Sequence, residues 1–593
     1  MSGVKTFLKK HRPAVALAVI ILALTALPAL DIFLVLGNSW HGILPNFSDE
    51  LNFARVHTIG EGHLTDGNAY YFEHRNGPPL VVFGGAWLNA LPLFAGVPFN
   101  TALYINFIIW SLLFAAAVYW LFRELGVPRW ANVFGTLLLY LEGYVHVWRP
   151  ANLQPVYPFF FLFYVALARL IREQSRKNIA LLALVIGVSF YVFAYLWQIA
   201  GITLLLFLLY ALSRKNWALA KAIAVSGCIG GIIGLPIPVY MLWLSNASPY
   251  FWQSMGRLGL VNTHLPMAEV IYSGGWVGVI LAFMAILAWR VCRLREDADF
   301  RRLNVFVWIS GLGLWVMQGS NLFTGKLLET GEHVRPFILL WLIFVTVGIG
   351  VFLWSRRALF SKRMRGFVGI MLGILSVANA YYIYDVFSPV ISPNIFRGQW
   401  QTEQQYAGPF AWLDENVQDP TVIWSDPHNP LAADLPIFTK HFTLDAYWGM
   451  LELAHDSEIR ERYLVSQYFN NPTLADLKSL PEMSLYLGRH DLPHEAETIN
   501  RGVKICQMLF FWNKNKNCGT LVTPQEVLGD KFFSDMETEF QTDIKPNIKA
   551  YLKKYHVTYI LKDDVLDPTY QPEELGAVRV YADSRFEIYR LPQ

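Results

Sequence analysis

The stretch whose residue types best suit proton transfer runs from Pro45 to Glu61, PNFSDELNFARVHTIGE. It follows the first long apolar segment and contains an adjacent acid pair, Asp49 and Glu50. Ser48 is placed to cap a short helix beginning at Asp49, and the helix dipole then keeps a first-turn carboxylate ionised. We interpret this helix as one that lies at a membrane surface and holds a general base there. In the plainer interpretation, both acids are solvated first-turn residues without a chemical role.

Basic residues accompany the acid pair in the long loops predicted on the same side of the membrane. Basic residues are otherwise concentrated on the opposite side, so the few in these loops are candidates for a functional role. The candidate substrate-binding residues are His74, Arg75, Glu142, Arg149, Asn152, Gln154, Lys326, His333 and Arg335, and Arg257 is a further basic residue on this side. Two alternatives stay open: Glu142 could simply pair with Arg149, and Arg149 could extend to the lipid headgroups beside Trp148.

We expect a carboxylate and several cations to line one lipid-facing cavity, where they would suit the transfer of a group from a lipid-linked phosphate. The carboxylate would remove a proton from an acceptor hydroxyl, and the cations would neutralise the charge that develops on a departing phosphate. Transfer of a sugar from a lipid-linked phosphate requires both groups. The sequence contains 4 cysteines and no CxxC motif, so no cysteine metal cluster is predicted.

Composition places these residues in a membrane protein. The chain has 593 residues, of which 54% are hydrophobic and only 16% are charged. These proportions are typical of a polytopic α-helical membrane protein and exclude a soluble enzyme. The net charge of +3 provides no basic excess, so nucleic acid is not expected as a partner.

Apolar segments of spanning length predict about eleven transmembrane helices. They lie near residues 13–31, 100–122, 130–147, 156–171, 178–195, 197–213, 218–244, 274–290, 303–322, 336–355 and 366–386. We interpret the first as a retained anchor rather than a signal peptide. Arg- and Lys-rich connections alternate with less basic ones, which predicts a cytoplasmic amino terminus in the plasma membrane.

An odd number of spans places the carboxyl-terminal segment outside the cell. We therefore expect a membrane domain over residues 1–387, with a first outer loop at 38–98 that contains surface helices, and a soluble extracytoplasmic α/β domain over 388–593. PTVIWSD, YHVTYILK and GAVRVYADSRFEIYRL predict strands, the last of them a hairpin. Cys506 and Cys518 lie in this domain, where a disulfide and two free thiols are both possible.

Two motifs and this layout resemble a known family. They are Ser48-Asp49-Glu50-Leu51-Asn52-Phe53 and Arg75-Asn76-Gly77-Pro78-Pro79-Leu80, with Phe122-Arg123-Glu124-Leu125-Gly126 as a family-like inner turn. The chain is similar to the GT-C class of integral-membrane glycosyltransferases, especially the protein O-mannosyltransferase and aminoarabinose transferase group. The resemblance covers residues 1–390 in architecture and about 45–130 in motif. It implies that Asp49 is the catalytic base, that Glu50 is its neighbour, and that the donor is a polyprenyl-phosphate sugar.

The sequence departs from this family at one place. Many members have a second acid in the loop after the third span, whereas here that loop reads Arg149-Pro150-Ala151-Asn152-Leu153-Gln154. We therefore expect catalysis without a metal or other cofactor and inversion at the anomeric carbon. The acceptor is a glycan, lipid or protein. A lipid-linked sugar transporter or flippase and a non-catalytic scaffold for envelope glycan assembly remain the alternatives, although the broken segment at 230–238 has no partner of the kind that transporters use.

Overall fold

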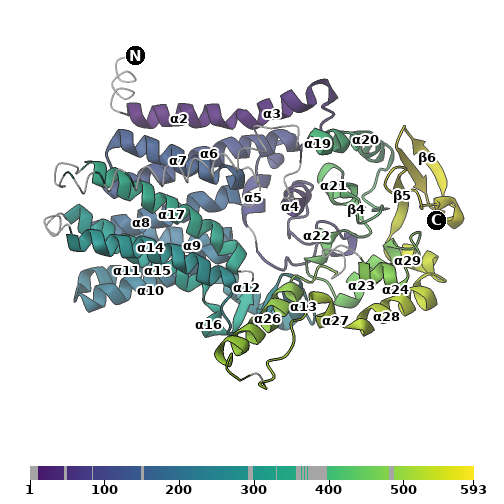
Figure 1. The fold of residues 1–593 in the computed structure, drawn as a ribbon. Coiled ribbons are helices and arrows are strands. Elements are labelled where there is room, and N and C mark those ends of the chain that lie inside the picture. Colours follow the sequence, from purple (N-terminus) through teal and green to yellow (C-terminus); the bar gives the residue numbers. More distant parts are fainter. Residues whose placement is uncertain are drawn as a thin grey trace, which may run out of the picture.

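The structure, a computed structural model, describes residues 11–45, 50–82, 84–147, 153–290, 298–328, 330–355, 397–479, 487–513 and 515–592, with isolated positions at 362, 366 and 370. A bundle of long helices forms one part of the molecule, and a mixed sheet surrounded by shorter helices forms the other (Figure 1). We call the end of the bundle nearest this sheet the sheet end and the opposite end the far end.

The bundle is formed mainly by long apolar helices. They are α2 (Arg12–Thr25), α3 (Leu27–Leu36), α6 (Phe99–Glu124), α7 (Arg129–Val147), α8 (Leu153–Arg172), α9 (Arg176–Val192), α10 (Ala194–Ser213), α11 (Trp217–Gly234), α12 (Pro236–Ala247), α14 (Ala268–Arg290), α15 (Ala298–Gln318) and α17 (Thr330–Ser355). Proline in the first turn of α3 and of α12 accompanies the breaks after Thr25 and Gly234.

Among the described residues, 7 helices are long and apolar enough to cross a membrane. Large apolar side chains stay exposed on them, such as Leu205 on α10 and Ile232 on α11, as expected where lipid rather than water covers a helix. The chain is therefore a multispan membrane protein. The last of the roughly eleven spans predicted by length, 366–386, lies almost entirely outside the described residues, and so does the predicted domain boundary at 387/388.

The loops at the sheet end contain short elements. The first loop includes η1 (Gly37–Ser39), α4 (Glu50–Gly60), η2 (Phe72–His74), α5 (Gly84–Ala90) and η3 (Leu93–Ala95). Later loops contribute α13 (Phe251–Arg257), β1 (Leu260–Asn262), α16 (Asn321–Thr324) and β2 (Lys326–Leu328). Strands β1 and β2 pair antiparallel, which joins two loops that are far apart in the sequence.

The carboxyl-terminal segment forms a five-stranded sheet of order β4-β3-β5-β7-β6. Its strands are β3 (Val422–Trp424), β4 (Phe442–Thr443), β5 (Val557–Asp563), β6 (Val578–Ala582) and β7 (Phe586–Arg590). Strand β3 is parallel to β4 and β5, whereas β5 and β6 are antiparallel to β7. The predicted strands and the final hairpin are confirmed, and β4 is an additional strand that the sequence did not indicate.

The rest of the carboxyl-terminal segment is mainly helical. Its helices are α19 (Arg397–Gln404), α20 (Ala407–Asn416), α21 (Pro430–Phe438), α22 (Tyr447–Met450), α23 (Asp456–Ser466), α24 (Leu474–Ser479), α26 (Asp491–Leu509), α27 (Pro524–Leu528), α28 (Asp530–Glu539), η6 (Phe540–Ile544), α29 (Ile548–Lys554) and η7 (Pro572–Leu575). Cys506 and Cys518 form a disulfide that closes a loop after α26.

The first loop and the carboxyl-terminal segment share one hydrophobic core. Phe53 of α4 and Tyr70 of the first loop are buried together with Val422 and Trp424 of β3. Phe193, between α9 and α10, packs against both this core and the core of the bundle. The first loop is thus fixed from two sides, by the sheet and by the sheet end of the bundle.

Candidate functional site

Helix α4 carries Glu50 as its first residue, directly after Asp49, which lies outside the described residues. Glu50 is half-buried, and its Oε2 atom is inaccessible to solvent. Most of the following residues of the helix are buried, including the polar Asn52, Arg55 and Thr58. Helices α5, α21 and α22 pack against α4, so protein covers much of its surface, and its position at a membrane surface stays a prediction.

Helix α5 connects α4 to the bundle. It packs against α4 on one side and against α6, α8 and α9 on the other. The close fit extends to the backbone: a Cβ added at Gly84 would lie 2.3 Å from the carbonyl oxygen of Tyr191, at the end of α9. The acid-bearing helix is thus held at the sheet end of the bundle, where the lipid-facing helices begin or end.

A buried ion pair fixes α4 within the first loop. Arg55 Nε donates to Asp66 Oδ1 at 2.9 Å, and Arg55 Nη2 donates to Asp66 Oδ2 at 2.5 Å. The same Nη2 donates to the carbonyl oxygen of Val81 at 3.2 Å, just after the Pro78–Pro79 pair. Burial alone would lower the pKa of Arg55, but the charges of Asp66 and Glu452 raise it above its ordinary value. Arg55 therefore stays charged and connects the helix to the Pro-Pro turn.

Glu452 is a buried acid that the sequence analysis did not single out. Its carboxylate lies 4.0 Å from Arg55 Nη1 and accepts a hydrogen bond from the backbone of Leu80. Burial raises the pKa of Glu452 to about 7, although Arg55 and the Leu80 amide oppose that shift. A carboxyl group that titrates near neutrality can serve in proton transfer, and it can equally be a structural acid. Glu452 is more than 350 residues from the Pro-Pro turn in the sequence, so local sequence patterns could not predict that the two lie close together.

A second ionic cluster joins the first loop to helix α23. Arg462 pairs with Glu73 from the loop and, through Nε at 2.9 Å, with Glu458 of its own helix. His74 Nε2 lies 2.9 Å from Glu458 Oε1. Burial alone would raise the pKa of Glu458, but the hydrogen bond with His74 and the charge of Arg462 lower it to about 2. His74, a predicted substrate-binding residue, thus has an ionic partner in the carboxyl-terminal segment.

Arg75, the residue after His74, folds back on its own turn. Its Nη1 donates to the carbonyl oxygen of Phe72, and its guanidinium carbon lies 3.6 Å from the centre of the Phe72 ring. A guanidinium stacked on an aromatic face gains a cation–π interaction. Among the residues that the structure describes, these contacts of Arg75 are local to η2.

Arg257 binds the carboxyl-terminal segment more extensively than any basic residue discussed above. Its Nε donates to the carbonyl oxygen of Met450 at 2.7 Å, and its Nη2 donates to those of Glu452 at 3.1 Å and Ala454 at 2.7 Å. Its Nη1 pairs with Asp456, and the side chain is only 1% exposed. The occurrence of a basic residue on this side of the bundle is thus explained by packing rather than by substrate.

Other predicted residues lie where α8, α10 and α17 meet at the sheet end. Gln154, near the start of α8, is fully buried, and in the part of the chain that the structure describes neither of its amide atoms has a hydrogen-bond partner. His333, near the start of α17, is exposed, and its ring centre lies 5.1 Å from that of Tyr195 on α10. Arg335 is exposed in the same turn. A buried amide without a partner is costly, so Gln154 marks a position where a polar ligand would be favourable.

The remaining predicted residues are spread over other elements. Lys326 is exposed in β2, and its Nζ lies 4.3 Å from the centre of the Trp252 ring. Glu142 lies in α7, whereas Arg149 and Asn152, like Asp49, fall outside the described residues. Within the described ranges, no group of three or more His, Cys, Asp or Glu side chains is arranged to hold a metal ion. Catalysis without a metal stays a prediction, because part of the acid-bearing region lies outside those ranges.

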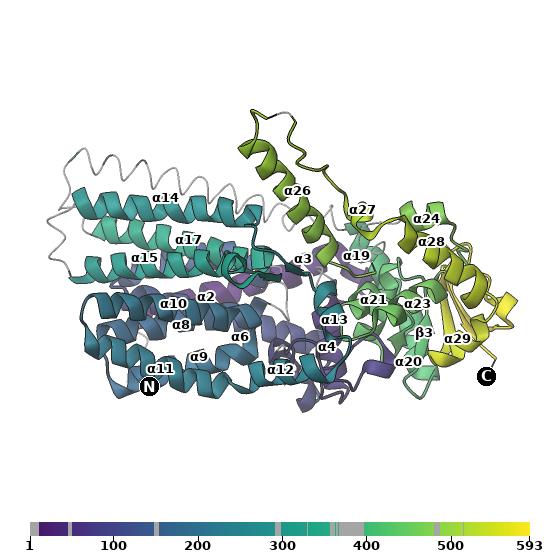
Figure 2. The same ribbon diagram turned by 90° about the horizontal axis from the view of Figure 1, so that it is seen from below.

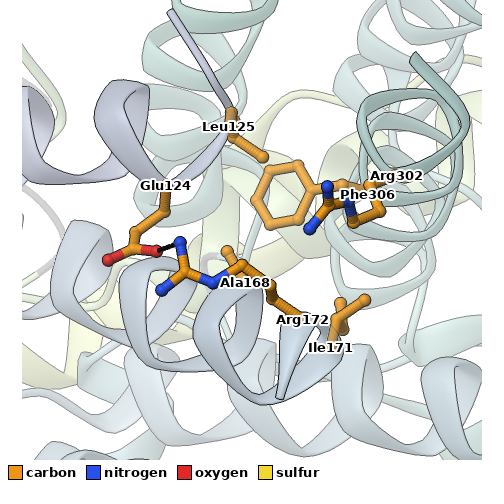
Figure 3. Close-up of a pocket in the computed structure, with 7 residues that line it drawn as sticks. All are labelled: Glu124, Leu125, Ala168, Ile171, Arg172, Arg302 and Phe306. Carbon is orange, nitrogen blue, oxygen red and sulfur yellow. Dashed lines mark ion pairs between the residues drawn. The ribbon is translucent and has the colours of Figure 1, made fainter. Parts of the chain in front are cut away.

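A small cavity lies at the far end of the bundle, away from all of these residues. It has a volume of about 10 Å³ and is lined by residues of α6, α8 and α15, including Glu124, Arg172 and Arg302 (Figure 3). Arg172 Nη1 lies 2.5 Å from Glu124 Oε2, and Arg169 Nε lies 3.9 Å from Glu124 Oε1. Glu124 belongs to the predicted inner turn, so this turn has a structural ion pair at its centre.

Comparison with known proteins finds likeness in structure but not in sequence. No protein-family model matches the sequence, and no curated protein matches it. The fold is similar to the crystal structure of ArnT from Cupriavidus metallidurans bound to undecaprenyl phosphate, with a TM-score of 0.41 and 14% sequence identity, covering 96% of this chain and 97% of that chain. We base the functional proposal on the residues of this chain.

Proposed function

We propose that this protein is a membrane glycosyltransferase that moves a sugar from a polyprenyl-phosphate donor to an acceptor hydroxyl. Asp49 acts as the general base, with Glu50 beside it. The observation that supports this proposal is the attachment of α4 to the sheet end of the bundle through α5 and the buried Arg55–Asp66 pair. Asp49 directly precedes this helix in the sequence, and a base held next to lipid-facing helices could reach a hydroxyl beside a lipid-borne phosphosugar.

The reaction that we propose is a single displacement. Asp49 takes the proton of the acceptor hydroxyl, the acceptor oxygen forms a bond to the anomeric carbon, and the bond from that carbon to the phosphate oxygen breaks, which inverts the anomeric configuration. The electron pair leaves with the polyprenyl phosphate. Lys326, His333 and Arg335 are exposed at the sheet end, and we assign them, together with Arg149, the role of stabilising the negative charge on this phosphate. Gln154 would donate to a sugar or phosphate oxygen.

His74 and Arg75 remain in the proposed site only as its support. His74 holds Glu458, and Arg75 holds the turn at Phe72, so both fix the loop that follows α4. Glu142 would contact the acceptor or donor from α7. We further propose that the amino terminus is cytoplasmic and that the sheet lies outside the plasma membrane, in agreement with the basic connections at the far end.

The proposal is tested by incubating purified protein in lipid nanodiscs with labelled polyprenyl-phosphate sugars and a membrane extract that supplies acceptors. Movement of the label to a glycan, lipid or protein, dependent on Asp49, would support it. Transport of the donor across vesicles without transfer would favour a flippase. Absence of both activities, with a phenotype on deletion of residues 397–592 only, would favour a scaffold.

A further inference from the structure

The end of α26 and the start of the loop after it contain exposed apolar residues that follow one another in the sequence, from Met508 to Trp512. Met508 is 66% exposed, Phe511 75% and Trp512 69%, and Leu509 and Phe510 are exposed as well. The disulfide between Cys506 and Cys518 closes this loop at its base. Large aromatic side chains gathered at one loop tip mark an interaction surface, because water is an unfavourable environment for them.

Hydrogen bonds and a disulfide hold the two ends of this loop together. Asn500 of α26 donates through Nδ2 to the carbonyl oxygen of Val522 at 2.8 Å and accepts from the Val522 amide at 2.7 Å. These bonds and the disulfide hold the returning chain against the helix. The Nζ atom of Lys516 lies 5.2 Å from the centre of the Phe510 ring, so a cation lies close to the apolar tip.

Helix α26 carries this tip to the membrane-spanning helices. At its start, the His490 amide donates to the carbonyl oxygen of Arg257 at 3.2 Å. Further along, α26 packs on β1, and a Cβ added at Gly502 would lie 3.9 Å from Leu265, just before the span Val270–Leu287 of α14. The helix then continues to Leu509, about 10 Å further at a rise of about 1.5 Å per residue.

Both views place the tip beside the sheet end of the bundle. In Figure 1 α26 lies next to α16 and α13, and in Figure 2 it projects sideways from the molecule at the level where α14 begins. The same end of the bundle has other exposed aromatic residues, namely Trp252 at 54%, Tyr272 at 72% and Phe323 at 81%. Exposed Trp and Tyr at the ends of spans are typical of a membrane–water interface.

We propose that the disulfide-closed loop inserts its aromatic tip into the lipid leaflet on the sheet side of the membrane. Lipid fits this surface better than a protein partner does, because the tip is level with the aromatic ends of the spans and combines Phe and Trp with lysine. An aromatic body in the acyl-chain boundary and an ammonium group among phosphates is the usual arrangement of an interfacial anchor. The loop anchors the carboxyl-terminal segment to the membrane at a point remote from the first loop. This inference does not depend on the proposed glycosyl transfer.

The test is the quenching of Trp512 by brominated lipid. The full chain is placed in nanodiscs of phosphatidylcholine with plain or brominated acyl chains, and the emission of Trp512 is obtained as wild type minus Trp512→Phe. We expect this difference to fall at least twofold in the brominated nanodiscs. The emission of Trp412 in α20, obtained as wild type minus Trp412→Phe, serves as the matched control. This emission should be equal in plain and brominated nanodiscs.

Equal Trp512 emission in the two kinds of nanodisc would overturn the proposal. Equal emission together with protection of Trp512 from acrylamide would also overturn it and would indicate a protein partner or a second copy of the chain. A second measurement leaves Trp512 in place: Phe511→Ser and Met508→Ser are at exposed positions, so the double variant should fold normally while the quenching of Trp512 declines. Unchanged quenching in that double variant would contradict insertion of the tip.

Discussion

His74 Nε2 lies 2.9 Å from Glu458 Oε1, and this pair joins the first loop to helix α23 across 384 positions of the sequence. Glu458 also accepts from Arg462, which in turn pairs with Glu73. The loop that carries the proposed base is therefore held by charges from the carboxyl-terminal segment.

The first prediction concerns acid stability at this pair. The folded-state pKa of Glu458 is lowered to about 2 from its ordinary 4.5, so its contribution to stability is fully present above about pH 4.5 and is lost as the pH falls toward 2. Glu458→Gln should lower the free energy of unfolding at pH 7 by roughly 1–3 kcal/mol. Between pH 4.5 and 3, the free energy of unfolding of this variant should fall much less than that of the wild type. Thermal unfolding in detergent across this range measures both effects. Glu574→Gln, at an exposed position, is the control; equal pH profiles for Glu458→Gln and wild type would refute the prediction.

The second prediction concerns Glu452, for which stability changes with pH in the opposite direction. Its pKa in the folded protein is raised to about 7, so the folded state binds the proton more tightly than the unfolded state and stability falls as the pH rises from about 4.5 to 7. Glu452→Gln imitates the protonated acid and should flatten this part of the profile. Arg55 keeps its bidentate pair with Asp66 in that variant, so the protein should still fold. A slope identical to that of the wild type, measured by thermal unfolding between pH 4.5 and 8, would show that Glu452 does not titrate as described.

The third prediction concerns Arg257. Arg257→Gln removes the donors for three backbone carbonyl groups and leaves Asp456 without its partner, which should cost about 3–5 kcal/mol. Arg257→Lys should restore only a small part of this loss, because an ammonium group cannot reproduce the planar set of guanidinium donors. Limited proteolysis between residues 445 and 460 gives the readout. Cleavage at the wild-type rate in Arg257→Gln would mean that these contacts contribute little.

Much of this fold follows from the sequence, for reasons that differ between elements. The spans follow from apolar runs, because the membrane requires a length and a composition that are both local properties. The strands β5, β6 and β7 follow from short alternating or β-branched segments with turn residues between them. The core shared by Phe53 and Trp424 could not be predicted, because it depends on contacts between segments whose local patterns carry no information about each other.

The candidate site shows the same limit. Local capping preferences predicted a helix that begins at the acid pair, and α4 begins at Glu50, whereas Ser48 and Asp49 lie outside the described residues. The roles of the basic residues could not be predicted, because a sequence does not distinguish a cation needed for packing from one needed for binding substrate. Arg257 and His74 have partners that lie about 200 and 384 positions away, respectively, and only the folded chain reveals them.

The fourth prediction separates stability from function at Gln154. Because this amide is buried and lacks a hydrogen-bond partner among the described residues, Gln154→Leu should leave the melting temperature unchanged or raise it. The same variant should lose sugar transfer by about tenfold or more if the amide donates to substrate, since one hydrogen bond to a charged group contributes roughly 1.5–3 kcal/mol. Transfer at the wild-type rate in a protein of normal stability would remove Gln154 from the proposed site.

The most direct test of the central claim is the rate of sugar transfer by Asp49→Asn in nanodiscs, measured beside Glu50→Gln and the affinity of both variants for the lipid-phosphate donor. We predict that Asp49→Asn loses transfer by about 10²–10⁴-fold, as expected for removal of a general base, while donor affinity changes by only a few fold. Glu50→Gln should have the smaller effect. Transfer by Asp49→Asn at the wild-type rate would contradict the assignment of the base and, with it, the proposed mechanism.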